Sequence, residues 1–234
     1  MSRYRPTRDI DFLGSSISNE KDEITNVIKE IIQIKSNDGL TFDDMSFKIE
    51  DIDHDGEYNG IRIIFYAFLE KSRERIQLDI GFGDKITSGP IEIDFPTILN
   101  FPTPKIKVYS IESAVAEKFE AIVSLQLQTS RMKDFYDILF LAYNYEFKKD
   151  TLKEAVLATF NHRATDIELR KKVFEEKFRT DEQLQKYWTA FLTRSILTSE
   201  NNFAKVVTKI SSFIEPVFHP ETKNNWNSKD WKWE

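Results

Sequence analysis

The chain has 234 residues, of which 40% are hydrophobic and 31% charged, and its formal net charge is −6. Because it contains no cysteine, a disulfide framework, a zinc knuckle and a thiol nucleophile are excluded. No apolar run approaches the roughly 20 residues of a membrane helix, and the polar N-terminus lacks the apolar core of a signal peptide. We therefore expect a cytoplasmic protein with no membrane partner.

Two aspartates close to the N-terminus are the first feature of chemical interest. The alternation over residues 8–13 predicts a strand with Ile10 and Phe12 on one face and Asp9 and Asp11 on the other. Two neighbouring carboxylates favour a cation between them, and Mg²⁺ takes one or two protein carboxylates. The alternative interpretation is an exposed edge strand whose outer face carries two acids.

The following residues predict a mixed sheet with a flanking helix. An apolar stripe with acids in its first turn predicts a helix over 19–34. Two alternating runs predict neighbouring antiparallel strands over 47–52 and 61–69, and a third run predicts a strand over 75–82.

The last of these strands carries a candidate for a third metal-binding acid. Asp79 falls on the face opposite the apolar residues, and the nearby Gly81 leaves room for a ligand. Asp84 and Asp94 are competing candidates, although both occur in sequences typical of loops.

A cluster of prolines from Pro96 to Pro104 predicts the domain boundary, which gives domains 1–102 and 103–234. A short strand over 105–109 leads to Ser110, a favourable N-cap. The tail is expected to be a loop whose tryptophans pack back onto the body or meet a partner. The predicted helices are 111–127, 131–146, 150–161, 166–178, 181–198 and 201–214.

Charged residues at two places in the helical half depart from an ordinary amphipathic pattern. Lys118 lies within an apolar stripe, either as a snorkelling lysine at its edge or as a cation aimed at nucleotide phosphates. Arg131, Asp134 and Asp137 are spaced three apart and share a helix face. Their alternative interpretation is a local charge cluster on a solvated face.

These residues together resemble the AbiEii/AbiGii family over about residues 3–142. The resemblance implies the DNA polymerase β nucleotidyltransferase fold, as found in toxin-like enzymes of toxin–antitoxin and phage-defence systems. We therefore predict an α+β, nucleotidyltransferase-like mixed-sheet domain with flanking helices, followed by an all-helical C-terminal domain. The residues that carry the resemblance are, in chain order, Arg5-x-Thr7-x-Asp9-Ile10-Asp11-Phe12, Asp79, Lys118-x-x-Ala121 and Arg131-x-x-Asp134-x-x-Asp137.

The resemblance also implies a reaction, the transfer of a nucleoside monophosphate from an NTP to a hydroxyl acceptor such as RNA or tRNA. It implies Mg²⁺ or Mn²⁺ as cofactor and a cognate antitoxin as protein partner. The implied metal ligands are Asp9, Asp11 and Asp79, and the implied catalytic residues are these three with Lys118 and Asp134. The implied nucleotide-binding residues are Thr7, Lys118, Arg131 and Asp137.

One element of the family pattern is missing from the sequence. A Gly-Gly or Gly-Ser turn normally precedes the paired aspartates by roughly ten residues, whereas Met1 precedes Asp9 by eight. We expect either a start further upstream or weakened nucleotide binding. Two alternatives therefore stay open, an inactive nucleotidyltransferase-like binding protein and a small-molecule nucleotidyltransferase of the antibiotic-modifying kind.

A basic run in the helical half is a further candidate for contact with RNA. Arg170, Lys171 and Lys172, with Lys177 and Arg179 after them, could meet a phosphate backbone. The neighbouring Glu175 and Glu176 favour a solvated helix face instead.

Overall fold

The computed structural model describes residues 5, 7–54, 58–83, 89–97 and 99–234, and its contacts divide the chain into two compact units. The sheet unit is Pro6–Asp84, and the helical unit joins Met1–Arg5 to Lys85–Glu234. The separation of sheet and helices along the chain confirms the α+β class. The predicted domain boundary after residue 102 stays a prediction.

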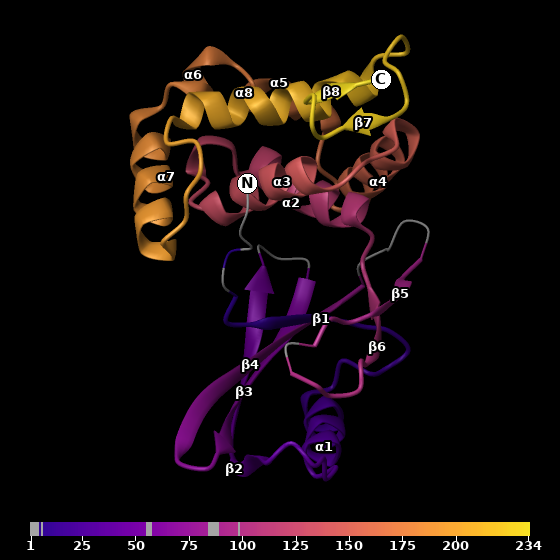
Figure 1. The fold of residues 1–234 in the computed structure, drawn as a ribbon, viewed down its shortest axis with the longest axis vertical. Coiled ribbons are helices and arrows are strands. Elements are labelled where there is room, and N and C mark those ends of the chain that lie inside the picture. The colour runs from indigo at the N-terminus through magenta and orange to yellow at the C-terminus, as the bar shows by residue number, and fades with distance from the viewer. Residues whose placement is uncertain (1–4, 6, 55–57, 84–88, 98) are drawn as a thin grey trace. The chain divides into compact units, whose positions relative to one another are not determined.

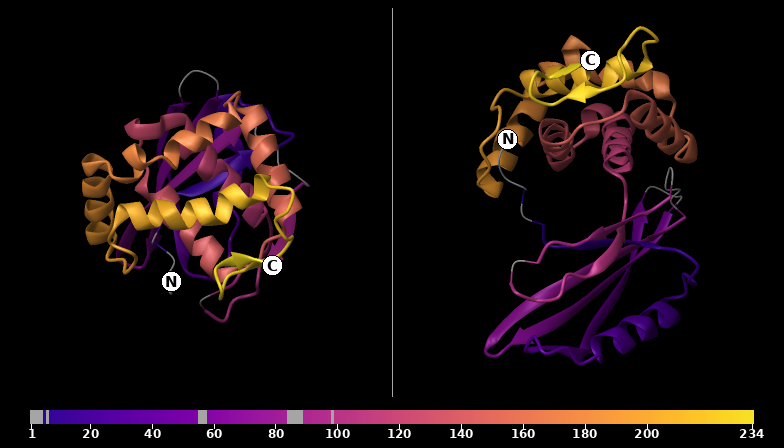
Figure 2. Two further views of the ribbon diagram at one scale, coloured as in Figure 1. Left: turned by 90° about the horizontal axis from the view of Figure 1, so that it is seen from above. Right: turned by 45° about the vertical axis from the view of Figure 1, so that its right-hand side comes forward.

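The sheet unit is a four-stranded mixed sheet in the order β1-β4-β3-β2 (Figure 1). Strand β1 (Ile10–Gly14) is parallel to β4 (Ser72–Phe82), whereas β3 (Tyr58–Leu69) is antiparallel to both β4 and β2 (Leu40–His54). Helix α1 (Lys21–Ile32) lies along one face of the sheet (Figure 2).

The strand register separates an apolar face from a polar one. Opposed residues of neighbouring strands share a face, so Ile61 opposite Ile80 and Ile63 opposite Leu78 build the core beneath α1. Ile10 and Phe12 belong to the same face, as predicted, but they are half exposed because β1 is an edge strand. The intervening residues, Asp79 among them, face the other side.

The predicted antiparallel pair of strands is confirmed, but its first strand begins at Leu40 and not near residue 47. The register shifts between Asp43 and Lys48, where Met45 is 89% exposed and its N–H donates to the Asp43 carboxylate at 3.0 Å. Such a bulge interrupts the two-residue alternation, and this removed the pattern by which a strand is recognised.

The helical unit is held together by helices that pack around one core. Helices α2 (Ile111–Leu125), α3 (Met132–Asn144) and α8 (Phe203–Ile214) bury most of their apolar side chains in one shared core. The Ser113 N–H donates to the Ser110 hydroxyl, which confirms the predicted cap of α2. The remaining elements are β5 (Ile91–Asp94), β6 (Lys105–Val108), α4 (Lys149–His162), α5 (Arg170–Val173), α6 (Glu176–Arg179), α7 (Glu182–Ser195), β7 (Trp226–Asn227), β8 (Lys232–Trp233) and the 3-10 turns η1 (Gln126–Gln128), η2 (Ile167–Leu169) and η3 (Glu215–Phe218).

Two predictions for this unit were wrong or incomplete. The single helix predicted over 166–178 is broken into η2, α5 and α6. Val173 and Phe178 are both buried. In a continuous helix these two side chains, five residues apart, would point in directions that differ by about 140°. The break in the helix lets both side chains reach the core. Strand β5, which pairs with the predicted strand β6, was not predicted. Within the described part of the chain, no helix is long and apolar enough to cross a bilayer.

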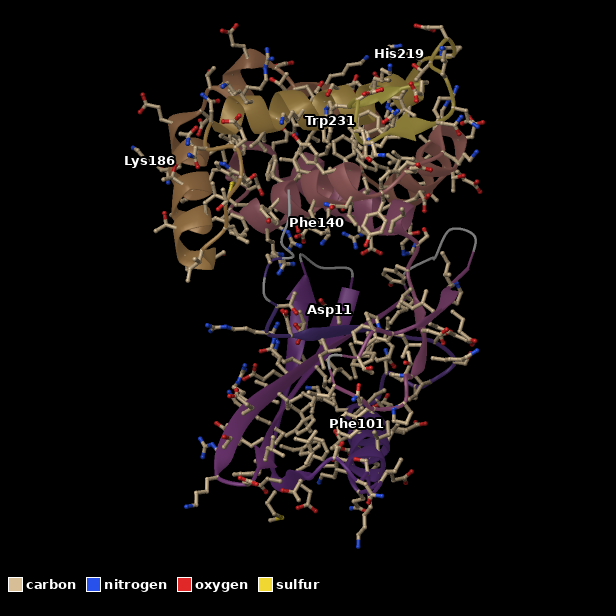
Figure 3. The ribbon with its side chains drawn as sticks, in the orientation of Figure 1. Asp11, Phe101, Phe140, Lys186, His219 and Trp231 are labelled. Atoms are coloured by element: carbon tan, nitrogen blue, oxygen red, sulfur yellow. The ribbon has the colours of Figure 1, made fainter. Side chains whose placement is uncertain are left out.

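The tryptophans of the tail pack back onto the helical unit. Trp226 is 1% exposed, and its indole N–H donates to the carbonyl oxygen of Ala142 at 2.8 Å. The indole of Trp231, labelled in Figure 3, donates to the Ser212 hydroxyl at 2.9 Å, and Trp233 donates to the Phe213 carbonyl at 3.0 Å. The short β7–β8 pair fixes these rings against α8.

We expect Trp226→Ala to destabilise the helical unit by about 3–5 kcal/mol, because it leaves a large cavity and an unpaired carbonyl. The partly exposed Trp231→Ala is the matched control and should cost clearly less. Urea unfolding followed by circular dichroism measures both. Equal losses for the two variants would contradict the assignment of Trp226 to the core.

Candidate active site

Three aspartates meet on the polar face of the sheet unit. Because β1 and β4 are parallel neighbours with Asp11 opposite Asp79, the two carboxylates stand side by side. Asp9 lies two residues before Asp11 and faces the same way. Each of the three offers an oxygen, and these oxygens lie within 4.8 Å of one another. Figure 3 labels Asp11 on this strand.

The three carboxylates fit a hard divalent cation. Oxygens on opposite sides of one Mg²⁺ are about 4.2 Å apart, so small side-chain rotations would bring all three within bonding distance. Asp9 and Asp79 are half-buried and Asp11 is exposed, which leaves one side of the cluster open to solvent and substrate. Three like charges this close repel unless a cation lies nearby. The structure thus brings the predicted acids together, and their role as ligands stays a prediction.

Asp79 is the most constrained of the three acids. The Arg62 guanidinium donates through Nε to Oδ1 at 2.8 Å and through Nη2 to Oδ2 at 2.7 Å. The Gln77 amide nitrogen lies 3.2 Å from both oxygens. The hydrogen bonds to Asp79 raise the pKa of Arg62 above its usual value, so this arginine stays charged.

Sequence reasoning missed Arg62, although a signal for it exists. Leu69 pairs with Ser72 across the two residues Glu70 and Lys71, and this tight turn fixes the register of the whole hairpin. Counting back along both strands from the turn places Arg62 opposite Asp79.

The predicted residues of the helical unit form a second charged cluster. Lys118 of α2 lies 3.2 Å from Asp137 and 3.8 Å from Asp134, both on α3. Arg131 donates to Asp134 at 2.5 Å. Arg5 donates to Asp137 from Nε at 2.9 and 3.1 Å and from Nη2 at 3.0 Å.

The charged residues of this cluster differ in burial. The Asp134 side chain is fully buried and so does not lie on a solvated face, whereas the Arg131 side chain is 39% exposed. Lys118 is 26% exposed and holds two acids, which distinguishes it from a snorkelling lysine. Arg131 offsets the charge of the Asp134 carboxylate through Oδ2, whereas Oδ1 has no hydrogen-bond partner within the described residues and lies 3.8 Å from the Lys118 ammonium group.

The remaining candidate residues lie outside both charged clusters or outside the described residues. Thr7 is exposed in the segment before β1. Asp94 ends β5 in the helical unit, where the register pairs it with Lys105, and Asp84 lies outside the described residues.

The basic run is balanced by acids, but not by the expected ones. Arg170 is buried between Glu168 at 2.9 Å and Glu215 at 3.1 Å, and Lys171 also pairs with Glu168. This supports a structural role for Arg170 and Lys171 over contact with RNA.

Comparisons with known proteins bear on the family and the fold of the chain. A family model described as "Nucleotidyl transferase AbiEii toxin, Type IV TA system" matches residues 2–209, whereas no curated protein sequence gives a significant match. The crystal structure of JHP933 from Helicobacter pylori has a TM-score of 0.52 at 14% identity, over 90% of this chain and 76% of that one. A second H. pylori structure, of a candidate nucleotidyltransferase, covers 91% of this chain and 78% of that one at 12% identity, and its TM-score of 0.47 is too low to carry an argument.

Proposed function

Because this chain belongs to the AbiEii family of nucleotidyl transferase toxins, we propose that it transfers a nucleoside monophosphate from an NTP to a hydroxyl acceptor. The observation that carries the proposal is the meeting of Asp9, Asp11 and Asp79 on one face of the sheet. We assign these three acids as ligands of Mg²⁺ or Mn²⁺. A bound divalent cation would activate the acceptor hydroxyl and neutralise charge on the leaving pyrophosphate.

The three proposed ligands differ in burial. Asp9 and Asp79 are half-buried, which limits the rotation of both side chains. Asp11 is exposed and faces the open side, so it is the acid nearest to an arriving substrate.

We assign binding of the nucleotide to the second cluster. Lys118 and Arg131 would contact phosphate oxygens, with Asp134 and Asp137 keeping both cations in position, and Thr7 would add a hydroxyl. Asp137 also accepts hydrogen bonds from Arg5, which belongs to the same helical unit.

The family membership motivates our proposals for the acceptor and the partner. We propose RNA, with tRNA as the first substrate to test, and a cognate antitoxin that opposes the activity in the cytoplasm. A small-molecule acceptor would use the same metal centre, and an inactive relative would bind the NTP without turnover.

An acceptor screen separates these readings. The protein is incubated with each of the four NTPs, labelled at the α-phosphate, and with total RNA, purified tRNA or aminoglycosides, with Mg²⁺, Mn²⁺ or a chelator. We expect the label to appear in RNA only when a divalent cation is present. Label in the aminoglycoside alone would overturn the RNA acceptor, and bound but untransferred NTP under all conditions would overturn the enzymatic function.

A further inference from the structure

The proposed metal centre has a neighbour that competes with the metal. Arg62 lies on β3, directly opposite Asp79 on β4, and its two nitrogens bind both oxygens of that carboxylate. Water has limited access to this ion pair, because the Asp79 side chain is 14% exposed and the Arg62 side chain 34%. An ion that binds at the three acids would therefore compete with Arg62 for the Asp79 carboxylate.

The acceptor capacity of Asp79 is nearly used up by its protein partners. A carboxylate offers about four lone-pair positions. The Arg62 fork takes one on each oxygen, and the Gln77 amide nitrogen lies 3.2 Å from each oxygen as well. A cation that binds Asp79 has to displace one of these contacts or share an oxygen with it.

Charge leads to the same expectation. The three carboxylates carry about −3 and Arg62 adds +1, which leaves a net charge near −2 for the group. One divalent cation matches this net charge. Without Arg62 the three carboxylates would carry one more negative charge and would attract the ion more strongly. A unit charge about 6 Å from a divalent cation changes its affinity by about tenfold even at the dielectric constant of water.

Arg62 also has a second carboxylate within its strand register. Glu50 of β2 lies opposite Arg62, on the side away from Asp79. Electrostatic attraction from Glu50 contributes to the raised pKa of Arg62, after the hydrogen bonds and attraction from Asp79. Glu50 itself pairs with Lys48, so Asp79 is the carboxylate that Arg62 binds directly.

We propose that Arg62 is a positioning residue that acts as an internal counter-ion, competing with the divalent cation for Asp79 and so lowering the affinity of the metal centre. The proposal rests on the proposed function, since it assumes that the ion binds at the three acids. It adds a residue that tunes the site through a ligand and does not touch the ion.

Calorimetric titration with Mn²⁺ alone tests this on the full-length protein. Arg62→Met should bind Mn²⁺ about tenfold more tightly than the parent, because the competing charge is gone. Arg62→Lys keeps the charge and should stay within about threefold of the parent. Arg75→Met removes the same charge from the same face, four residues along β4, and should change the affinity less than about twofold.

The outcomes separate this inference from the function on which it rests. A merely structural arginine would give weaker or unchanged Mn²⁺ binding in Arg62→Met, and that result overturns the counter-ion role while the metal centre stands. Adding Asp11→Asn to Arg62→Met should remove the gain, which locates it at the acids. A parent protein with no saturable Mn²⁺ binding would overturn the metal centre itself. Arg62→Gln, a shorter neutral variant, repeats the test if Arg62→Met does not fold.

Discussion

Replacing Asp11 by asparagine is expected to lower nucleotidyl transfer by about 10³-fold or more while the sheet stays folded. Asp11 is exposed on an edge strand, so the substitution removes a charged ligand and costs little packing. Metal assistance is worth several kcal/mol of transition-state stabilisation, and each 1.4 kcal/mol is about tenfold in rate. Initial rates with an α-labelled NTP measure the loss, and thermal unfolding checks the fold.

Asp44→Asn is the matched control for this variant. Asp44 is an exposed acid of β2 in the same unit, so its neutralisation changes the net charge equally without touching the acid cluster. We expect its rate to stay within about twofold of the parent. An Asp11→Asn protein that keeps more than a tenth of the parent rate would remove Asp11 from the metal centre.

Replacing Lys118 by methionine is expected to lower transfer by about 10²–10³-fold, the usual loss when one positioned donor to a developing charge is removed. It should also cost about 1–3 kcal/mol of stability, because Lys118 pairs with Asp137 at 3.2 Å and lies 3.8 Å from the fully buried Asp134. The rate measured below the melting transition separates the two effects, and urea unfolding measures the second.

Two companion variants decide between a structural and a nucleotide-binding lysine. Lys205→Met makes the same change at an exposed position of α8 and should leave both quantities unchanged. Lys118→Arg keeps the charge beside Asp134 and should restore most of the stability. If Lys118→Met is destabilised but transfers nucleotide at the parent rate, the lysine serves the fold alone.

Much of the sheet could be predicted because its pattern is local. Alternation over 61–69 and 75–82 is nearly unbroken, and β3 and β4 follow it to the residue at their C-terminal ends. The early part of β2 was missed because the bulge after Asp43 breaks the alternation. The helix predicted over 166–178 failed for another reason, since two buried aromatic and aliphatic positions outweighed local helical preference.

The candidate site was predictable to the extent that strand position determines it. Asp9 and Asp11 share a face because they are two residues apart, and the apolar face of β4 fixed the direction of Asp79. Pairing of β1 with β4 is a long-range contact that alternation alone does not specify. Arg62 was missed because alternation alone does not specify its partner. The short turn at Glu70 and Lys71 does give the register of its hairpin.

The ionic pairs of the helical unit were beyond sequence reasoning in a different way. Spacing places Asp134 and Asp137 on one side of α3, but it does not say that Asp134 is fully buried or that Arg5 binds Asp137 from the far end of the chain. Such contacts depend on how α2, α3 and the N-terminal segment pack, which is set by the whole core.

The most direct test of the metal centre is anomalous diffraction from crystals of the parent protein grown with Mn²⁺. We predict a peak on the polar face of the sheet, within bonding distance of an oxygen from each of Asp9, Asp11 and Asp79, and its loss in Asp11→Asn. A Mn²⁺ peak bound elsewhere, with these three carboxylates uncoordinated in a protein that still transfers nucleotides, would contradict the account.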